Sequence, residues 1–297
     1  MPSDAASVRE DIDIAAWRSA TFRDKIQFNT KILRADLANF FLYQFRCVDG
    51  FLITGKNSGT HWLKFMLSCA IAHEFGVSPP RFSSGVEANA IIGHPSRPPM
   101  YAALPRIGSA HTIPSKAFAW RWLNRLAPHP PVVLLVRDIR SAMLSNYVKW
   151  KDSYNVPLSD YVRGDPSGKR FIADIWWYIH FFNRWGTIQQ KRPENVLILR
   201  YEDLLQDHAT ALSLAARHWG LHLSPPAIDA AMPYASRKGI AEKLDPAFGE
   251  TVIPAPSAKR MLGFANADHD FIDDMFAKHL RHSLGYDLRT SSFRVSR

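Results

Sequence analysis

The sequence has few cysteines and no long apolar stretch. Only two of its 297 residues are cysteine, Cys47 and Cys69. This count excludes a disulfide framework and suits a reducing compartment. No apolar run approaches the ~20 residues that a membrane-spanning helix needs, and the polar residues 1–10 lack the apolar core of a signal peptide. These absences predict a cytoplasmic protein.

The sequence also lacks any block of consecutive Lys and Arg residues, although its formal net charge is +10. Such a charge suits nucleic acid, an anionic membrane or a polyanionic small molecule. Without a basic tract, nucleic acid is the least favoured of the three. The length allows one large α/β domain or two small ones. Because no linker or internal repeat is visible, we expect a single domain over 1–297, with 1–20 as a loosely held lead-in.

Short apolar segments alternate with longer helical patterns along the chain. A parallel sheet covered by helices on both faces follows from this alternation. The expected fold is therefore a three-layer α/β/α domain. The expected strands are 47–54, 131–136 and 195–200, and the expected helices are 141–150, 171–190 and 210–219.

Another helix is predicted to begin at Thr60. Its apolar residues, among them Trp62 and Leu63, recur at helical spacing and leave Lys64 and Ser68 off the buried face. Near the end of the chain, residues 271–284 predict a helix that stops at Gly285, a typical terminating residue.

Three further segments carry weaker patterns. Residues 79–105 and 236–262 contain several prolines and predict long loops, which in compact domains are usually functional. Residues 21–46 are basic and aromatic and predict a helix. This helix is expected to pack against the sheet, and the alternative is that it lies on an anionic membrane surface.

A glycine-containing loop follows the first expected strand, with the sequence Gly55-Lys-Asn-Ser-Gly-Thr60. A helix N-terminus offers unpaired N–H groups to an anion, and Gly55 and Gly59 let the backbone approach it closely. Lys56 adds a positive charge, and the Ser58 and Thr60 hydroxyls donate to phosphate oxygens or cap the helix. The loop is neither Gly-x-x-x-x-Gly-Lys-Ser/Thr nor Gly-x-Gly-x-x-Gly. The alternative interpretation is a plain strand-to-helix turn.

A second anion-binding candidate follows the strand at 131–136. Arg137 comes directly after this strand, where ligands bind in open parallel sheets, and Ser145 lies eight residues later on the next helix. An arginine fork and a hydroxyl suit one phosphate. The alternative is an ion pair between Arg137 and Asp138 or Glu202. Two such candidates on adjacent strand–helix units favour a ligand with two separated anionic groups.

These motifs, in this order, resemble those of a known family. Ser58-Gly-Thr60 with Trp62, then Val136-Arg137 with Ser145, and then Leu199-Arg-Tyr-Glu-Asp-Leu204 are similar to the PAPS-dependent sulfotransferases, where PAPS is 3′-phosphoadenosine 5′-phosphosulfate. The segment 105–111, followed by Pro114, resembles the strand that carries the family's catalytic histidine. The resemblance runs from about Phe51 to Gly285 and implies a P-loop-like fold.

The resemblance also implies roles for individual residues. The loop would hold the 5′-phosphosulfate, Trp62 and Tyr201 would lie at the adenine, and Arg137 with Ser145 would bind the 3′-phosphate. His111 would be the general base, and its alternative is a strand-end histidine bonded to a backbone carbonyl. The implied catalytic residues are His111 and Lys56, and the implied donor-binding residues are Lys56, Asn57, Ser58, Gly59, Thr60, His61, Trp62, Arg137, Ser145, Tyr201, Lys259 and Arg260.

The sequence departs from the family at two lysines. The family usually places lysine directly before Ser-Gly-Thr, where this chain has Asn57, and often two residues before the histidine, where it has Ser109. Lys56 is expected to reach in along a shifted loop, or another cation substitutes. For the family's late Arg-Lys-Gly, both Arg237-Lys238 and Lys259-Arg260 are candidates, and the spacing favours the second.

The implied reaction uses PAPS as co-substrate and no metal. Its acceptor would be a small phenol, lipid, glycoside or natural product with a hydroxyl or amine. His61 and His94 are reserve candidates for the base. A P-loop-like nucleotide-dependent kinase and a non-catalytic nucleotide-binding protein are the rival functions. The candidate acceptor-binding residues are aromatic or apolar: Phe82, Met100, Tyr101, Trp176, Trp177, Phe181 and Phe248. The alternative for Trp176, Trp177, Phe181 and Trp185 is that they are core residues, and for most of these four the core is favoured.

Overall fold

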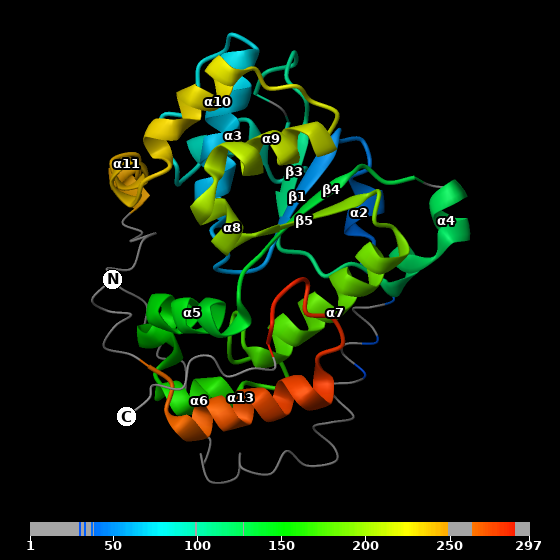
Figure 1. Ribbon diagram of the computed structural model, residues 1–297, viewed down its shortest axis with the longest axis vertical. Coiled ribbons are helices and arrows are strands. Elements are labelled where there is room, and N and C mark those ends of the chain that lie inside the picture. The colour runs from blue at the N-terminus through cyan, green and yellow to red at the C-terminus, as the bar shows by residue number, and fades with distance from the viewer. Residues whose placement is uncertain are drawn as a thin grey trace, which may run out of the picture.

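The computed structural model describes residues 30, 33, 37, 39–98, 100–126, 128–248 and 263–288. In this part of the chain, five strands form one parallel sheet in the order β2-β3-β1-β4-β5 (Figure 1). The predicted parallel sheet is confirmed. The strands are β1 (Gly50–Thr54), β2 (Ile92–Gly93), β3 (Ile107–Ala110), β4 (Val132–Val136) and β5 (Val196–Arg200).

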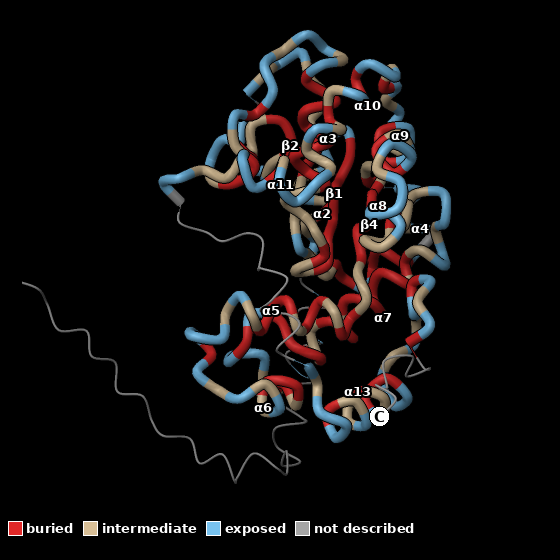
Figure 2. The backbone as a smooth tube through the Cα atoms, turned by 60° about the vertical axis from the view of Figure 1, so that its left-hand side comes forward, coloured by how far each residue is buried: buried red, intermediate tan, exposed pale blue. Residues whose placement is uncertain are grey.

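Helices cover both faces of this sheet. Alternate residues of β1 enter different clusters, since Phe51 and Ile53 pack on one face and Leu52 on the other, as the two-residue period of a strand requires. All three side chains are buried, and the strands form the buried centre of the tube in Figure 2. The three-layer α/β/α prediction is therefore confirmed.

The helices divide into two layers around the strands (Figure 1). One layer contains α3 (Thr60–Glu74), α9 (His208–His218) and α10 (Pro225–Ala231), and the other contains α5 (Ile139–Tyr154), α6 (Leu158–Arg163), α7 (Ile175–Lys191) and α13 (Asn266–His279). The remaining helices are α2 (Phe41–Gln44), α4 (Arg121–Leu126), α8 (Tyr201–Gln206) and α11 (Arg237–Ala241), and the short 3₁₀ turns are Glu87–Asn89, Lys116–Ala119, Met232–Tyr234 and Pro246–Phe248. No helix within the described ranges is both long and apolar enough to cross a bilayer.

The strand order places β1 between β3 and β4. Because the strands are parallel, their carboxyl ends lie at one edge of the sheet. The loop after Thr54 is therefore flanked by His111, which follows β3, and by Arg137, which follows β4. Two segments that are far apart in the sequence are thus brought to either side of the first loop.

The prediction for the helix that begins at Thr60 was right in position and wrong in its surroundings. Lys64 and Ser68 are buried along with the apolar residues of α3. Helix α3 is buried on more than one side because α10 and the 3₁₀ turn at Glu87–Asn89 both pack against it. The Lys64 ammonium group donates to the Asn89 side-chain oxygen over 2.8 Å.

Other boundaries also differ from the predictions. Helix α13 ends at His279 and not at Gly285, because its backbone turns extended at Leu280. The segment 236–262, predicted as a loop, begins with helix α11, whose first turn the Ser236 hydroxyl caps by accepting from Gly239 N–H. Segment 79–105 contains a short strand, β2, between loops.

For the segment 21–46 the structure describes only part of the chain. Helix α2 contributes the buried side chain of Leu42. Leu33, Leu37 and Phe40 are at least 43% exposed. Leu42 is therefore buried, as the predicted packing against the sheet requires, whereas Leu33, Leu37 and Phe40 are not.

Candidate functional site

A cavity of about 280 Å³ opens where the carboxyl ends of β1, β3 and β4 meet. Its volume is close to the lower end of the range typical of ligand sites. Most of the residues predicted for the site contribute to its wall. The lining residues are Lys56, Asn57, Gly59, Thr60, His61, Trp62, His111, Arg137, Ser145, Asn146, Lys149, Trp150, Ile172, Tyr201, Arg237 and Ile240.

The loop between β1 and α3 is shaped by two residues with left-handed backbone. Gly59 has φ of 89°, and a side chain there would meet the Tyr201 ring at 2.7 Å. Asn57 has φ of 57°, a conformation that asparagine tolerates better than most residues. This backbone gives a physical reason for asparagine at the position where the family resemblance led us to expect lysine.

Ser58 and Thr60 complete the turn into the helix. Ser58 is 1% exposed, and its N–H donates to the Gly55 carbonyl over 3.3 Å. The Thr60 hydroxyl lies 2.8 Å from the Thr54 hydroxyl. The loop is therefore a tight turn, as the alternative interpretation held, and it is also one wall of the cavity.

Arg137 joins the two anion-binding candidates predicted from the sequence. Its Nη1 donates to the Asn57 carbonyl over 3.1 Å and to the Ser145 hydroxyl over 3.2 Å, and its guanidinium lies 4.5 Å from the centre of the Tyr201 ring. The predicted alternative was an ion pair with Asp138 or Glu202, but Glu202 instead accepts bonds from the Tyr286 hydroxyl and the Asp138 N–H.

His111 is anchored to the neighbouring strand through one ring nitrogen. Its Nδ1 lies 2.9 Å from both the carbonyl oxygen and the hydroxyl of Thr54. The backbone-carbonyl contact given as the alternative role is therefore present, but the ring also faces the cavity and is solvent-accessible there. Protein surrounds the rest of the ring, and this desolvation is the main reason that the pKa of His111 is lowered. The nearby charges of Lys56, Lys64 and Lys149 lower it further.

Lys56 lines the cavity, but its ammonium group is already engaged. It donates to the Ile172 carbonyl over 2.6 Å and lies 5.1 Å from the centre of the Trp177 ring. Burial lowers the pKa of Lys56, and the negative charge of Asp174 partly offsets that effect. The side chain therefore reaches across the mouth of the loop to the segment before α7.

Trp62 and His61 begin helix α3 at the cavity wall. The indole N–H of Trp62 donates to the Tyr234 carbonyl over 2.7 Å, and its ring meets the rings of Tyr201 and His208 edge to face. Desolvation is the largest cause that lowers the pKa of His61 to about 4, with nearby lysines adding to it. His61 is therefore neutral near pH 7.

Sequence reasoning missed several residues of the cavity. Asn146, Lys149 and Trp150 lie on α5 just beyond Ser145. Lys149 lies four residues after Ser145, one helical turn further along the same face, which was the available signal for it. Ile172, just before α7, also lines the cavity, and no sequence motif signals it.

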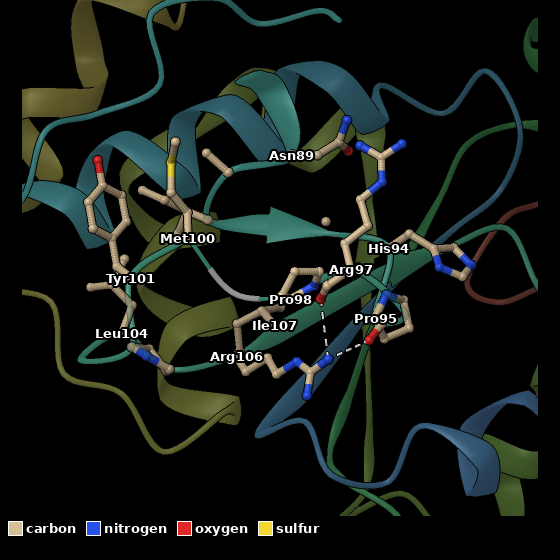
Figure 3. Close-up of a pocket in the computed structure, with 14 residues that line it drawn as sticks. Asn89, His94, Pro95, Arg97, Pro98, Met100, Tyr101, Leu104, Arg106 and Ile107 are labelled. Atoms are coloured by element: carbon tan, nitrogen blue, oxygen red, sulfur yellow. Dashed lines mark hydrogen bonds between the residues drawn. The ribbon is translucent and has the colours of Figure 1, made fainter. Parts of the chain in front are cut away.

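The candidate acceptor residues on α7 belong to the core, which was their favoured alternative. Phe181 is fully buried, and Trp177 packs against the core and lies beneath Lys56. Met100 and Tyr101 line a second, smaller cavity of about 30 Å³ beside β2 and β3, together with His94 (Figure 3). His94 is thus outside the larger cavity, so its reserve role as the base is not supported by its position.

One of the two late basic pairs reaches the cavity. Arg237 lines the wall with Ile240, although the spacing argument favoured Lys259 and Arg260. The latter two lie outside the described residues, as does the Phe248 side chain.

The cavity is chemically suited to a polyanion. Among its lining residues in the described chain, Lys56, Arg137, Lys149 and Arg237 are cationic and none is a carboxylate. Arg137 Nε and Asn146 Nδ2 are buried and have no hydrogen-bond partner among the described residues. Buried donors are rarely left unpaired, so these two groups fit a ligand with accepting oxygens, such as a nucleotide bisphosphate.

Comparison with known proteins identifies one family. A profile described as the sulfotransferase domain matches residues 48–240, which is more than half of the chain and includes every lining residue of the larger cavity. No curated protein matches the chain by sequence.

Several solved structures resemble the chain at low identity. A retinol dehydratase in complex with androsterone and the inactive cofactor PAP is 16% identical over 83% of this chain and 85% of that one, with a TM-score of 0.49. Mouse sulfotransferase SULT7A1 complexed with PAP is 15% identical over 82% and 90%, with a TM-score of 0.48. A sulfotransferase from Alicyclobacillus acidocaldarius is 10% identical over 78% and 92%, with a TM-score of 0.42.

Proposed function

Because the chain belongs to the sulfotransferase domain family, as its motifs predicted, we propose that it transfers a sulfuryl group from PAPS to a hydroxyl or amine of a small acceptor. The observation that carries this proposal is the position of Arg137. Its side chain is hydrogen-bonded both to Asn57, in the loop between β1 and α3, and to Ser145 on α5. Two anion-binding elements are thereby held at a fixed separation, as a donor with two separated anionic groups requires.

The donor would lie across the cavity from the loop to α5. Backbone N–H groups and hydroxyls at Ser58 to Thr60 would bind the 5′-phosphosulfate at the start of α3. The unpaired Nε of Arg137 and the Ser145 hydroxyl would bind the 3′-phosphate. Trp62 and Tyr201 would lie against the adenine, and Arg237, which lines the same cavity, would close over the 3′-phosphate.

Sulfuryl transfer forms a bond from the acceptor oxygen or nitrogen to sulfur and breaks the bond from sulfur to the 5′-phosphate oxygen. The nucleotide bisphosphate leaves with the bonding electrons, and the acceptor proton must go to a base. As in phosphoryl transfer, positioning and electrostatic stabilisation supply most of the rate. The four cations of the lining are suited to the charge that develops on the leaving phosphate.

His111 is proposed as the general base. A carbonyl oxygen only accepts hydrogen bonds, so the contact with the Thr54 carbonyl requires the hydrogen on Nδ1. The neutral ring then has its lone pair on Nε2, which is free to take the acceptor proton. The lowered pKa keeps the ring neutral at physiological pH.

Lys56 is proposed to assist the leaving phosphate in place of the lysine that Asn57 replaces. The contact with the Ile172 carbonyl holds its ammonium group at the cavity wall. Moving from that carbonyl to a phosphate oxygen exchanges a hydrogen bond to a neutral acceptor for one to a charged acceptor.

The same features weigh against the rival functions. A P-loop-like kinase would need the lysine position of a Walker loop and an acidic residue for Mg²⁺, and no carboxylate lines the described cavity. A non-catalytic binding protein would not need a histidine held with its free nitrogen toward the ligand. We propose a small-molecule acceptor as the partner and the cytoplasm as the location.

The proposal is tested by thermal stabilisation with 3′-phosphoadenosine 5′-phosphate (PAP), using adenosine 5′-phosphate as the control. A ligand that binds only the folded state raises Tm in proportion to the logarithm of its concentration over Kd. We expect PAP to raise Tm at concentrations where adenosine 5′-phosphate has no effect. Equal effects of the two nucleotides, or no effect of either, would contradict the proposed donor.

A further inference from the structure

Lys56 is hydrogen-bonded to the segment around α7 at two points, and only one of them has been given a role. Its ammonium group donates to the Ile172 carbonyl just before that helix. Its backbone carbonyl accepts a hydrogen bond from the hydroxyl of Tyr178, within α7, over 2.9 Å. The second contact joins the loop between β1 and α3 to a residue that is outside the described cavity lining.

Tyr178 is a fixed and permanent donor. Its side chain is 1% exposed, and Asp174 caps the start of its helix by accepting from the Trp177 N–H over 3.0 Å. Burial raises the pKa of the Tyr178 hydroxyl above its ordinary value, so the proton stays on the oxygen at physiological pH. A buried hydroxyl needs an acceptor, and the Lys56 carbonyl is that acceptor.

This contact sets the orientation of the peptide unit between Lys56 and Asn57. No peptide bond in the described part of the chain is cis, and in a trans peptide the C=O and N–H groups point in opposite directions. Because the Lys56 carbonyl points toward Tyr178, the Asn57 N–H points away from α7. Asn57 lines the cavity, and its N–H has no hydrogen-bond partner among the described residues. The Asn57 N–H is therefore available to a ligand.

The neighbouring carbonyls of the loop are occupied by protein donors as well. The Asn57 carbonyl accepts from Arg137 over 3.1 Å, and the Gly55 carbonyl accepts from the Ser58 N–H over 3.3 Å. Each carbonyl from Gly55 to Asn57 thus has a partner within the protein, which leaves the loop's N–H groups for an anion. Left-handed backbone at Asn57 and Gly59 curves such N–H groups around one point, as in backbone anion sites.

We propose that Tyr178 is a positioning residue for the donor: its hydroxyl holds the Lys56 carbonyl toward α7 and thereby turns the Asn57 N–H toward the 5′-phosphosulfate. The inference rests on the proposed function, because it takes PAPS as the ligand of the loop. It also gives a role to position 57, where the family resemblance implied a lysine. At this position a backbone N–H, oriented from behind by a tyrosine, donates in place of an ammonium group.

The test compares Tyr178→Phe with Tyr147→Phe. Tyr147 is a matched control, because it is buried and its hydroxyl also donates to a backbone carbonyl, that of Val156, over 2.8 Å. Each variant loses one such hydrogen bond and keeps its aromatic ring, so both should lower the Tm of the unliganded protein by similar amounts. A purely structural role for Tyr178 would therefore make the two variants alike in every measurement.

Nucleotide affinity, measured by titration calorimetry, separates the two variants. Tyr178→Phe should weaken PAP binding by about tenfold, since hydrogen bonds to charged groups are the strong ones, and Tyr147→Phe should leave it unchanged. Adenosine 5′-phosphate shares the 5′-phosphate, so Tyr178→Phe should weaken it by the same factor. Equal PAP affinity in the two variants overturns the inference. A loss confined to PAP also overturns it, because Tyr178 would then act at the 3′-phosphate through Arg137, which contacts Asn57.

A measurement on the unaltered protein tests the Asn57 N–H directly, even if Tyr178→Phe does not fold. In protein labelled with ¹⁵N-asparagine, the Asn57 amide proton should move downfield on addition of PAP, because it gains a charged acceptor. Asn155 is the internal control, since its φ is 49° and its N–H already donates to the Lys151 carbonyl over 2.8 Å. Asn57→Gly, which tolerates left-handed backbone, identifies the resonance by its loss. An Asn57 resonance that does not move at saturating PAP overturns the inference.

The proposed function and the role of Tyr178 fail in different ways. If PAP does not bind the unaltered protein, the proposed donor is wrong and the inference is rejected with it. If PAP binds the unaltered protein and Tyr178→Phe equally well, the proposed function stands and only the role of Tyr178 is rejected.

Discussion

His111 and Thr54 are joined across two strands, with Nδ1 of the histidine 2.9 Å from the carbonyl oxygen of the threonine. The contact sets the ring orientation and the tautomer together. Because the anchor is a backbone atom, it persists in any variant of the Thr54 side chain. The geometry of the proposed base therefore depends on the sheet itself.

Replacing the proposed base should remove catalysis and leave donor binding in place. General bases typically contribute ~10²–10⁴-fold, so we expect His111→Ala to lower kcat by about that factor. The PAP-induced rise in Tm should be retained, which separates loss of chemistry from loss of folding. Near-normal turnover by this variant would remove His111 from the mechanism.

The pH profile gives an independent test of the same residue. A base must be neutral to act, and the pKa of His111 is lowered from 6.5, first by desolvation and then by nearby lysines. We therefore expect kcat/KM to be independent of pH above 6.5 and to decrease at lower pH, with the midpoint of this acid limb below pH 6.5. Lys149→Met removes one of these charges, so the limb should move to higher pH, whereas Lys151→Met should not move it. A limb above pH 6.5 in the unaltered enzyme contradicts the assignment.

The Ser145 hydroxyl should distinguish bisphosphate from monophosphate. A hydrogen bond to a charged group contributes about 1.5–3 kcal/mol, so Ser145→Ala should weaken PAP binding by about tenfold or more. Binding of adenosine 5′-phosphate should change little, because it lacks the 3′-phosphate. Titration calorimetry measures both affinities. Ser141→Ala on the same helix is the control, and equal losses for the two nucleotides would place Ser145 elsewhere on the ligand.

Gly59 should be essential for the loop for two separable reasons. Its φ is 89°, and a Cβ would meet the Tyr201 ring at 2.7 Å, whereas Gly76 has φ of 66° with no atom within 4 Å of an added Cβ. Both Gly→Ala changes incur the left-handed backbone cost of about 1–2 kcal/mol. Only Gly59→Ala should also lose the PAP-induced rise in Tm. If Gly76→Ala loses it equally, the Tyr201 contact is not the cause.

His129 should make the fold less stable in mild acid. It is 5% exposed, and its Nε2 lies 2.7 Å from Arg192 Nη1. Since a guanidinium only donates, this nitrogen accepts and the ring is neutral. Desolvation is the main cause that lowers the pKa of His129 to about 4.

The sign of the pH effect follows from this lowered pKa. The unfolded chain takes up a proton below pH 6.5 while the folded chain does not, so the free energy of unfolding falls as pH decreases from 6.5 to about 4. At pH 5 the loss from this residue is about 2 kcal/mol. Urea denaturation at pH 7.5 and pH 5.0 measures it, and His129→Gln should reduce the difference. An unchanged difference in that variant would assign the effect to other groups.

Much of the architecture could be read from the sequence because the strands are short and apolar. The run at 131–136 suited a strand buried on both faces, and it is β4. Arg137 and Ser145 were predicted as a pair from their positions at the strand end and on the next helix, and the structure places them in contact. The local sequence pattern was sufficient to place a residue wherever its position depended only on one strand and the helix that follows it.

The predictions failed where distant segments decide the surroundings. Lys64 is buried because the 3₁₀ turn that contains Asn89 packs on α3, and nothing in the α3 sequence signals that neighbour. Lys149 escaped notice because an exposed lysine on a helix usually faces solvent. Asn57 looked like a missing lysine, whereas its left-handed backbone shows why an asparagine suits the position.

The cavity wall is drawn from residues between Lys56 and Ile240. Its first part, the loop after β1, is synthesised early, and its last part, helix α11, more than halfway along the chain. During translation the proposed donor therefore has no complete site until Arg237 and Ile240 have left the ribosome. Its full binding energy could stabilise only a chain that has been synthesised beyond that point.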